Sequence, residues 1–127
     1  MTKYAPRHLG KQSERSVRRL DLIGWTHGAM TVRLECSEFT SLCPVTKHPD
    51  FGQLSIEYVP AGAIVETKSL KLYLRRFRSK AEFNEVIVAT IADEFYKQVR
   101  PRRVTVTGRF NVRGGISPIA IATRGEP

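Results

Sequence analysis

A cysteine and an aspartate stand close together in segment 38–51, which carries two prolines between strand-like runs. Cysteine attacks an electrophile as the thiolate, and a nearby carboxyl group can exchange protons with whatever the sulfur attacks. The pattern therefore predicts an active-site loop in which Cys43 is the nucleophile and Asp50 the acid or base. By spacing alone, such a pair is more often a small apolar residue and a turn residue.

A second polar cluster, Glu66 with Lys68 and Lys71, lies at the predicted start of the first helix. Free backbone N–H groups and the positive end of a helix dipole favour phosphate, and lysines add charge. A phosphate site and an amphipathic helix with a solvated basic face explain the cluster about equally well. Arg113 and Gly114, in an Arg-Gly-Gly sequence, would let the backbone approach an anion, although this sequence is more often a tight turn.

Asn84 and Glu85 form the remaining polar pair, near the start of the second predicted helix. The apolar neighbours of Glu85 indicate that its carboxylate is partly buried and needs hydrogen-bond donors. Two adjacent N–H groups on a purine-like ring would satisfy it in a bidentate manner. A glutamate in the first turn of a surface helix is the commoner case.

The chain has 127 residues, of which 41% are hydrophobic, enough for one domain and too few for two. No apolar run could span a membrane and the N-terminus lacks a secretion signal, so we expect a cytoplasmic protein. The net charge of +9 favours an anionic partner, such as nucleic acid, a phosphorylated cofactor or an acidic protein. We expect residues 1–20 to form a flexible basic arm before a single domain over residues 21–127.

The two cysteines, Cys36 and Cys43, do not indicate a disulfide framework. Cys36 lies on the apolar face of an alternating strand and is expected in the core. There is no Cys-x-x-Cys or His-Glu-x-x-His pattern, so no metal site is expected. Because Gly-x-Gly-x-x-Gly is also missing, a nicotinamide cofactor would bind outside a dinucleotide fold.

Hydrophobic periodicity predicts the elements that position these residues. In chain order they are strands at 29–36 and 52–59, helices at 68–78 and up to 99, and strands at 104–110 and 116–122. A capping box at 79–82 is expected to start the second helix. The order β-β-α-α-β-β indicates an α+β fold, in which an antiparallel sheet carries both helices on one face. Its open edges favour assembly with further copies.

Several stretches of the chain are distinctive together. They are Glu38-Phe39-Thr40-Ser41-Leu42-Cys43-Pro44, Pro49-Asp50-Phe51, Glu66-Thr67-Lys68-Ser69-Leu70-Lys71-Leu72-Tyr73, Phe83-Asn84-Glu85 and Arg113-Gly114-Gly115-Ile116-Ser117. In this order they resemble the short, single-domain type of 7-cyano-7-deazaguanine reductase, the QueF family of the GTP-cyclohydrolase-I-like superfamily. The resemblance covers about residues 22–122.

The resemblance implies a tunnelling fold (T-fold) and a homo-oligomer with active sites between subunits. It implies that two NADPH reduce the nitrile of 7-cyano-7-deazaguanine to the primary amine 7-aminomethyl-7-deazaguanine, in queuosine biosynthesis for tRNA modification. Cys43 would form a covalent thioimide with the nitrile, and Asp50 would protonate the nitrogen. The residues implied to bind the guanine-like base are Val65, Glu66, Thr67, Asn84 and Glu85. Those implied to bind NADPH are Lys68, Lys71, Arg113 and Gly114.

The chain departs from the family pattern at two positions. Asn84 stands where the family usually has a histidine, so a group that titrates near neutrality is missing. Ile87 stands where some members have a second cysteine that can pair with the nucleophile.

Three alternatives to the reductase remain. One is an amidinotransferase that passes the thioimide to an amine donor on deazaguanine in tRNA, and another is a non-catalytic basic nucleic-acid-binding module. The third is a zinc-dependent cyclohydrolase on the same fold. The Glu-Thr-Lys-Ser-Leu-Lys stretch is typical of the NADPH-using branch, so direct tRNA binding is not expected.

Overall fold

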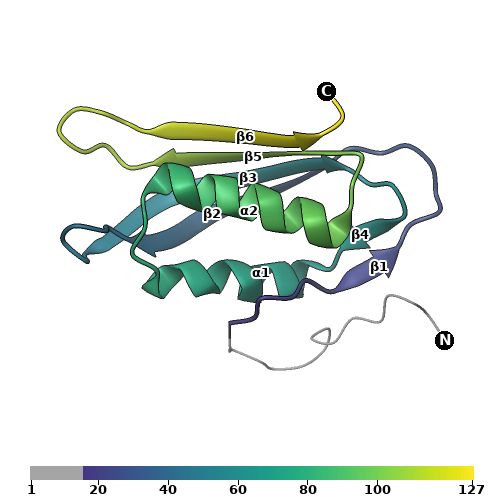
Figure 1. The fold of residues 1–127 in the computed structure, drawn as a ribbon, viewed down its shortest axis with the longest axis horizontal. Helices are drawn as coiled ribbons and strands as arrows, with labels where there is room; N and C mark the ends of the chain where they lie inside the picture. Colours follow the sequence, from purple (N-terminus) through teal and green to yellow (C-terminus); the bar gives the residue numbers. More distant parts are fainter. Residues whose placement is uncertain (1–15) are drawn as a thin grey trace.

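The computed structural model of the chain describes residues 16–127 (Figure 1). In chain order its elements are β1 (Leu22–Gly24), β2 (Val32–Leu42), β3 (Pro49–Val59), β4 (Ala63–Val65), α1 (Thr67–Arg75), a 3₁₀ helix (Arg76–Ser79), α2 (Asn84–Val99), β5 (Arg103–Phe110) and β6 (Ile119–Gly125). One antiparallel sheet has the strand order β2-β3-β5-β6, and β1 pairs with β4 in a second, small sheet.

The core lies between the larger sheet and the helices (Figure 1). On β3, Leu54, Ile56 and Tyr58 are buried against the helices, whereas the alternating Ser55 and Glu57 lie on the opposite face. Each fully buried large apolar side chain contributes roughly 1.5–3 kcal/mol. Helix α2 covers β5 and β6 with its buried residues Ile87, Val88, Ile91, Ala92, Phe95 and Val99.

The predicted α+β fold, with both helices on one face of an antiparallel sheet, is confirmed. The short strands β1 and β4 are additions to the predicted order. Each has three residues, which is too few to show a period of two. Leu22 pairs with Val65 in this small sheet, which therefore anchors the chain immediately before α1.

The predicted loop over 38–51 is wrong, because most of it is a β-hairpin. β2 continues to Leu42 and β3 begins at Pro49, and these two residues are cross-strand partners. The register shifts between Cys36 and Phe39, which marks a bulge. A bulge breaks the alternation of apolar and polar residues. The alternation therefore stops near Cys36, although β2 continues to Leu42.

The capping box predicted at 79–82 is also wrong. Phe83 occupies the N-cap position of α2 without a side-chain hydrogen bond, and the proposed cap serine still belongs to the 3₁₀ helix. Glu82 instead accepts from the N–H of Phe83 at 3.0 Å. The reason is that the chain between the helices pairs with β2, where the N–H of Leu42 donates to the carbonyl of Lys80 at 3.1 Å.

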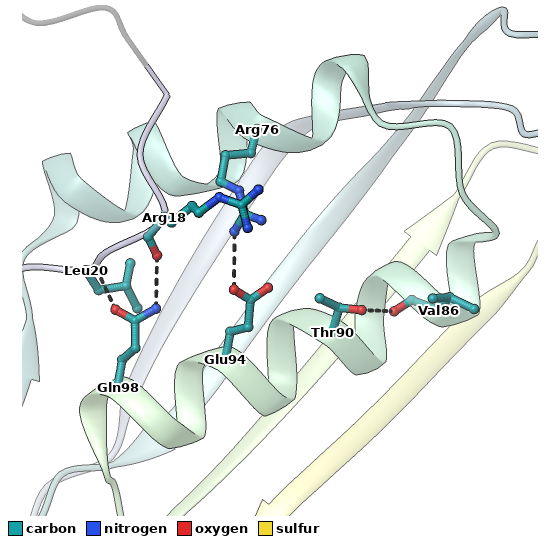
Figure 2. Close-up of polar contacts among 7 residues, drawn as sticks. All are labelled: Arg18, Leu20, Arg76, Val86, Thr90, Glu94 and Gln98. Atoms are coloured by element: carbon teal, nitrogen blue, oxygen red, sulfur yellow. Dashed lines mark hydrogen bonds and ion pairs between the residues drawn. The ribbon is translucent and has the colours of Figure 1, made fainter.

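The segment before β1 is fastened to α2 by a single amide side chain (Figure 2). Gln98 donates to the carbonyl of Arg18 at 3.0 Å and accepts from the N–H of Leu20 at 2.7 Å. Leu20 is buried in the core. The predicted boundary between a flexible arm and the domain, at residue 20, is therefore too far along the chain, because Arg18 and Leu20 belong to the domain. Residues 1–15 of the predicted arm lie outside the described part.

Further polar contacts lie where α2 faces the 3₁₀ helix (Figure 2). Arg76 pairs with Glu94 at 3.2 Å and lies over the rings of Tyr73 and Phe77. These contacts hold the helix pair together above the sheet. Within residues 16–127, neither helix combines the length and apolarity needed to cross a membrane.

Candidate active site

Cys43 follows β2 directly and opens the short loop that leads into β3. Its N–H donates to the carbonyl of His48 at 2.9 Å, and its carbonyl accepts from the N–H of Lys47 at 2.9 Å. Lys47 has a φ of 63°, a left-handed conformation that reverses the chain, and its Nζ donates to the carbonyl of Pro44. The loop is thus a closed turn that fixes the backbone of Cys43.

This turn lowers the pKa of the Cys43 thiol from an ordinary 9.0 to about 6. The backbone N–H of Thr46 contributes most, followed by the Thr46 hydroxyl and the N–H of Val45, while partial burial opposes them and Arg113 also donates to the sulfur. Successive N–H groups in a turn form a concave site that binds an anion. The thiol is therefore mainly thiolate at neutral pH, which a nucleophile requires.

Asp50 lies directly opposite Ser41 in the β2–β3 pair. Residues that oppose each other in an antiparallel pair share a face, and both side chains here are buried on the helix side. A guanidinium nitrogen of Arg113 lies 3.2 Å from Asp50 Oδ1. The structure therefore brings Cys43 and Asp50 to the same end of the hairpin, with Arg113 in contact with both.

The sequence reasoning missed Ser41. Its hydroxyl is fully buried and has no hydrogen-bond partner among residues 16–127. A buried hydroxyl costs about 1–3 kcal/mol unless water or a ligand satisfies it. Ser41 could have been found from its position two residues before Cys43, because residues i and i+2 of a strand share a face.

The start of α2 lies beside the hairpin, because Ala81 forms a bridge with Leu42. Asn84 is the first residue of α2, and its Oδ1 is buried without a partner in the described part of the chain. Glu85 is exposed, so the expectation of a partly buried carboxylate is wrong for a single chain. Together they place hydrogen-bond acceptors directly after the segment that pairs with Leu42, the residue before Cys43.

Glu66 caps α1. Its carboxylate is buried and accepts from the backbone N–H groups of Lys68 and Ser69, the latter at 3.0 Å. Such a cap stabilises a helix by roughly 0.5–2 kcal/mol. Beside it, Val65 is buried and Thr67 is exposed. Because Glu66 takes these two backbone donors, the lysine side chains are the main donors left for a phosphate at the head of this helix.

Lys71 lines a cavity of about 450 Å³ between α1 and β2. Arg75 and Arg78 line the same cavity and follow Lys71 at about one-turn intervals, so the three cations share one side of the helix. The apolar lining includes Leu34, Leu54, Ile56, Leu70 and Leu74. The charged lining is mixed, with Glu35 and Glu38 beside Arg33 and these three cations, so positive charge is in excess. An apolar floor with an excess of cations at the rim suits a flat ring that carries phosphate groups.

Arg113 and Gly114 lie in the connection between β5 and β6. The N–H groups of Arg113 and Ile116 each donate to the other's carbonyl, at 2.9 and 3.0 Å. Gly114 and Gly115 have φ values of 57° and 80°, which match a type I′ hairpin turn. The tight-turn interpretation of Arg-Gly-Gly is therefore confirmed, and the turn directs Arg113 to Asp50.

The elements that carry the predicted site residues lie at two ends of the molecule: the β2–β3 turn, the start of α2 and the β5–β6 connection at one end, and the start of α1 at the other (Figure 1). The group at the hairpin end contains Cys43, Asp50, Asn84, Glu85, Arg113 and Gly114. The group at the start of α1 contains Val65, Glu66, Thr67, Lys68 and Lys71. Helix α1 and the 3₁₀ helix run between them and span roughly 20 Å. Lys71 lies midway along α1 and lines the same cavity as Thr40, three residues before Cys43, whereas Lys68 lies at the start of the helix.

Within residues 16–127, no group of three or more His, Cys, Asp or Glu side chains is placed to hold a metal ion. Both cysteines are free thiols. Cys36 packs against the core from its partly buried position, in agreement with the predicted apolar face.

The chain was compared with known proteins. A family model described as QueF-like protein matches residues 49–127. The NADPH-dependent 7-cyano-7-deazaguanine reductase of Anaeromyxobacter sp. (strain Fw109-5) is 46% identical over 95 residues, 75% of this chain and 78% of the relative. The protein of that name from Bacteroides thetaiotaomicron is 48% identical over 96 residues, 76% and 64% of the two chains. The one from Frankia casuarinae is 39% identical over 115 residues, 91% and 92% of the two chains.

The fold is similar to that in the crystal structure of the archaeosine synthase QueF-Like in the apo form. The TM-score is 0.69 at 21% identity, and the match covers 81% of this chain and 99% of that chain. This likeness concerns the fold alone and supports the predicted tunnelling fold. Since the family model matches more than half of the chain and the curated relatives are similar over most of it, the chain belongs to the QueF-like family.

Proposed function

We propose that this protein is an oxidoreductase that uses NADPH to reduce the nitrile of 7-cyano-7-deazaguanine to the amine 7-aminomethyl-7-deazaguanine, in queuosine biosynthesis for tRNA modification. The observation that carries the proposal is the Cys43 thiol, whose pKa of about 6 makes it a ready nucleophile beside the buried Asp50. The relatives, 39%, 46% and 48% identical, are named NADPH-dependent 7-cyano-7-deazaguanine reductase. The thiol and the family point to the same reaction.

Cys43 acts as the nucleophile and Asp50 as the proton donor. The thiolate attacks the nitrile carbon, a C–S bond forms, and one π-electron pair of the C≡N bond moves to nitrogen. The nitrogen takes a proton from the Asp50 carboxyl group, which regains one from solvent, and a neutral thioimide results. The covalent bond converts a group that resists hydride into a reactive C=N electrophile, without need of a metal ion. A free thiolate persists in a reducing compartment, so we place the reaction in the cytoplasm.

Glu85 and Asn84 bind the guanine-like base from the start of α2. A carboxylate accepts two adjacent N–H groups in a bidentate manner, and the Asn84 amide adds a further acceptor. Both follow, within four residues, the Ala81 bridge to Leu42, the residue before Cys43. A base held there places its nitrile substituent toward the sulfur. An amide does not titrate near neutrality, so Asn84 orients the base and moves no proton.

The residues along α1 fit the phosphates of NADPH. Lys68 and Lys71 supply ammonium groups, and the cavity beside Lys71 offers an apolar floor for a ring. When bound, NADPH supplies hydride, and reduction of a nitrile to an amine requires two. The protein itself binds the phosphates and thereby orients the nicotinamide.

We place the complete site between two subunits of a homo-oligomer. In one chain the start of α1, which carries Lys68, lies roughly 20 Å from the end of the 3₁₀ helix beside the hairpin, so a second copy supplies that group to the site of its neighbour. The strands β2 and β6 are open edges of the sheet. The β2–β3 hairpin, the start of α2 and the β5–β6 connection expose large apolar side chains, namely Val45, Phe51, Phe83, Val112 and Ile116. A second copy would cover them.

The test is the intact-protein mass after mixing with 7-cyano-7-deazaguanine in the absence of NADPH. We expect a mass increase of one substrate, which Cys43→Ala abolishes and the matched control Cys36→Ala retains. Addition of NADPH should remove the adduct, with two NADPH oxidised for each amine formed. An adduct that NADPH leaves in place contradicts the reductase, and a wild-type protein that forms no adduct contradicts the whole proposal.

A further inference from the structure

Arg113 has a contact that its expected role does not explain. The resemblance assigns it to the NADPH phosphates, yet a guanidinium nitrogen lies 3.2 Å from Asp50 Oδ1. The side chain of Asp50 is 8% exposed and that of Arg113 48%. An ion pair between a guanidinium group and a carboxylate is directional, so this pair has a defined geometry.

The backbone around Arg113 is fastened to the strand that carries Asp50. The Arg113–Ile116 turn closes with two reciprocal hydrogen bonds, and the N–H of Asn111 donates to the carbonyl of Phe51 at 3.1 Å. Phe51 follows Asp50 directly in β3. Backbone hydrogen bonds thus join the segment of Arg113 to the strand of Asp50, and an ion pair joins the two side chains.

We propose that Arg113 is a positioning residue for thioimide formation, the step that precedes hydride transfer. The inference rests on the proposed function. By pairing with Oδ1, Arg113 holds the Asp50 carboxyl group in one orientation and leaves Oδ2 to exchange the proton with the nitrile nitrogen. Displacement of a reacting group by about 1 Å can slow a step about hundredfold.

This role differs from cofactor binding in a measurable way. A residue that only binds NADPH phosphates changes the KM for NADPH and leaves the reaction of the thiol with the nitrile untouched. A positioning residue changes the rate of adduct formation before any NADPH is present. The two roles are therefore separated by an experiment without cofactor.

The experiment measures the rate of adduct formation with 7-cyano-7-deazaguanine, without NADPH, in the full-length wild type, Arg113→Gln, Arg113→Lys and Arg102→Gln. Arg102 is a matched control, because it is exposed and pairs with Glu126 at 3.3 Å next to the start of β5. We expect adduct formation to slow about tenfold or more in Arg113→Gln. Arg113→Lys keeps the charge and should recover part of the rate, and Arg102→Gln should match the wild type.

Two further measurements separate positioning from damage to the fold. Alkylation of Cys43 by iodoacetamide and the unfolding temperature should stay near wild-type values in Arg113→Gln, because the N–H groups and hydroxyl of the hairpin provide most of the thiolate stabilisation. An unchanged adduct rate with a raised KM for NADPH would overturn the inference. So would joint loss of alkylation and adduct formation. A wild type that forms no adduct would refute the proposed function, and the inference with it.

Discussion

The acidity of the Cys43 thiol has its origin in the turn that follows it, and this makes it testable residue by residue. Because the pKa is lowered to about 6, the thiol is protonated and unreactive below that pH and becomes thiolate as the pH rises through it. The rate of alkylation of Cys43 by iodoacetamide, followed by peptide mass, should therefore rise with an inflection near 6 and level off well below pH 9.

Replacement of Thr46 by valine removes the hydroxyl that donates to the sulfur and keeps the backbone N–H. The inflection should move to higher pH, so that alkylation at pH 7 is slower than in the wild type. Thr26→Val is the control, since Thr26 is exposed in the loop between β1 and β2. A profile for Thr46→Val that superimposes on the wild type would mean that the hydroxyl does not stabilise the thiolate.

The chemistry-bearing residue types were identifiable from the sequence, but their contacts were not. Cys43 and Asp50 are recognisable by type and by the stretches around them. Ser41 is opposite Asp50 only because of the strand register, and Arg113 reaches Asp50 from a different turn. A hydrophobic period indicates which face of an element a residue occupies, and it carries no information on the residue that faces it from another element.

The contact between β5 and α2 depends on a glycine. A Cβ at Gly108 would lie 2.7 Å from Cγ2 of the buried Val88 and 2.8 Å from the ring of Phe110. Valine is stiff about χ1, so the helix or the strand would have to shift. Gly108→Ala should lower the free energy of unfolding by about 1–3 kcal/mol, measured by urea denaturation at fixed protein concentration.

Gly62→Ala is the matched control for this element contact, since a Cβ at Gly62 would meet nothing within 4 Å. It should change the free energy of unfolding by less than about 0.5 kcal/mol. Equal effects of the two substitutions would show that loss of glycine flexibility, and not the close approach of α2 to β5, determines the stability.

At the scale of elements, long periodic segments were predictable and interruptions were not. The middle of each helix and of β3 and β5 follows from repeated apolar positions. The bulge near Cys36 interrupts the alternation, so the last part of β2 was not predicted. The chain before Phe83 pairs with β2, so the expected cap of α2 does not form. Both errors arise where contacts with another strand override the local pattern.

For the molecule as a whole, the proposed site between subunits predicts complementation between inactive subunits. Cys43→Ala and Lys71→Ala, each inactive or strongly impaired alone, should regain activity when unfolded together and refolded as mixed oligomers. If every site combines Cys43 of one subunit with Lys71 of another, random mixing at equal amounts leaves about a quarter of the sites intact.

The readout is NADPH oxidation per milligram of protein, with the two variants refolded separately and then combined as the control. Recovery confined to the co-refolded sample would place the two groups on different subunits. No recovery, with mixed oligomers verified by mass, would mean that both groups act within one chain. The stretch of about 14 Å from Lys71 along α1 and the 3₁₀ helix to the hairpin end would then have to be spanned by the extended cofactor itself or closed by a rearrangement of those helices.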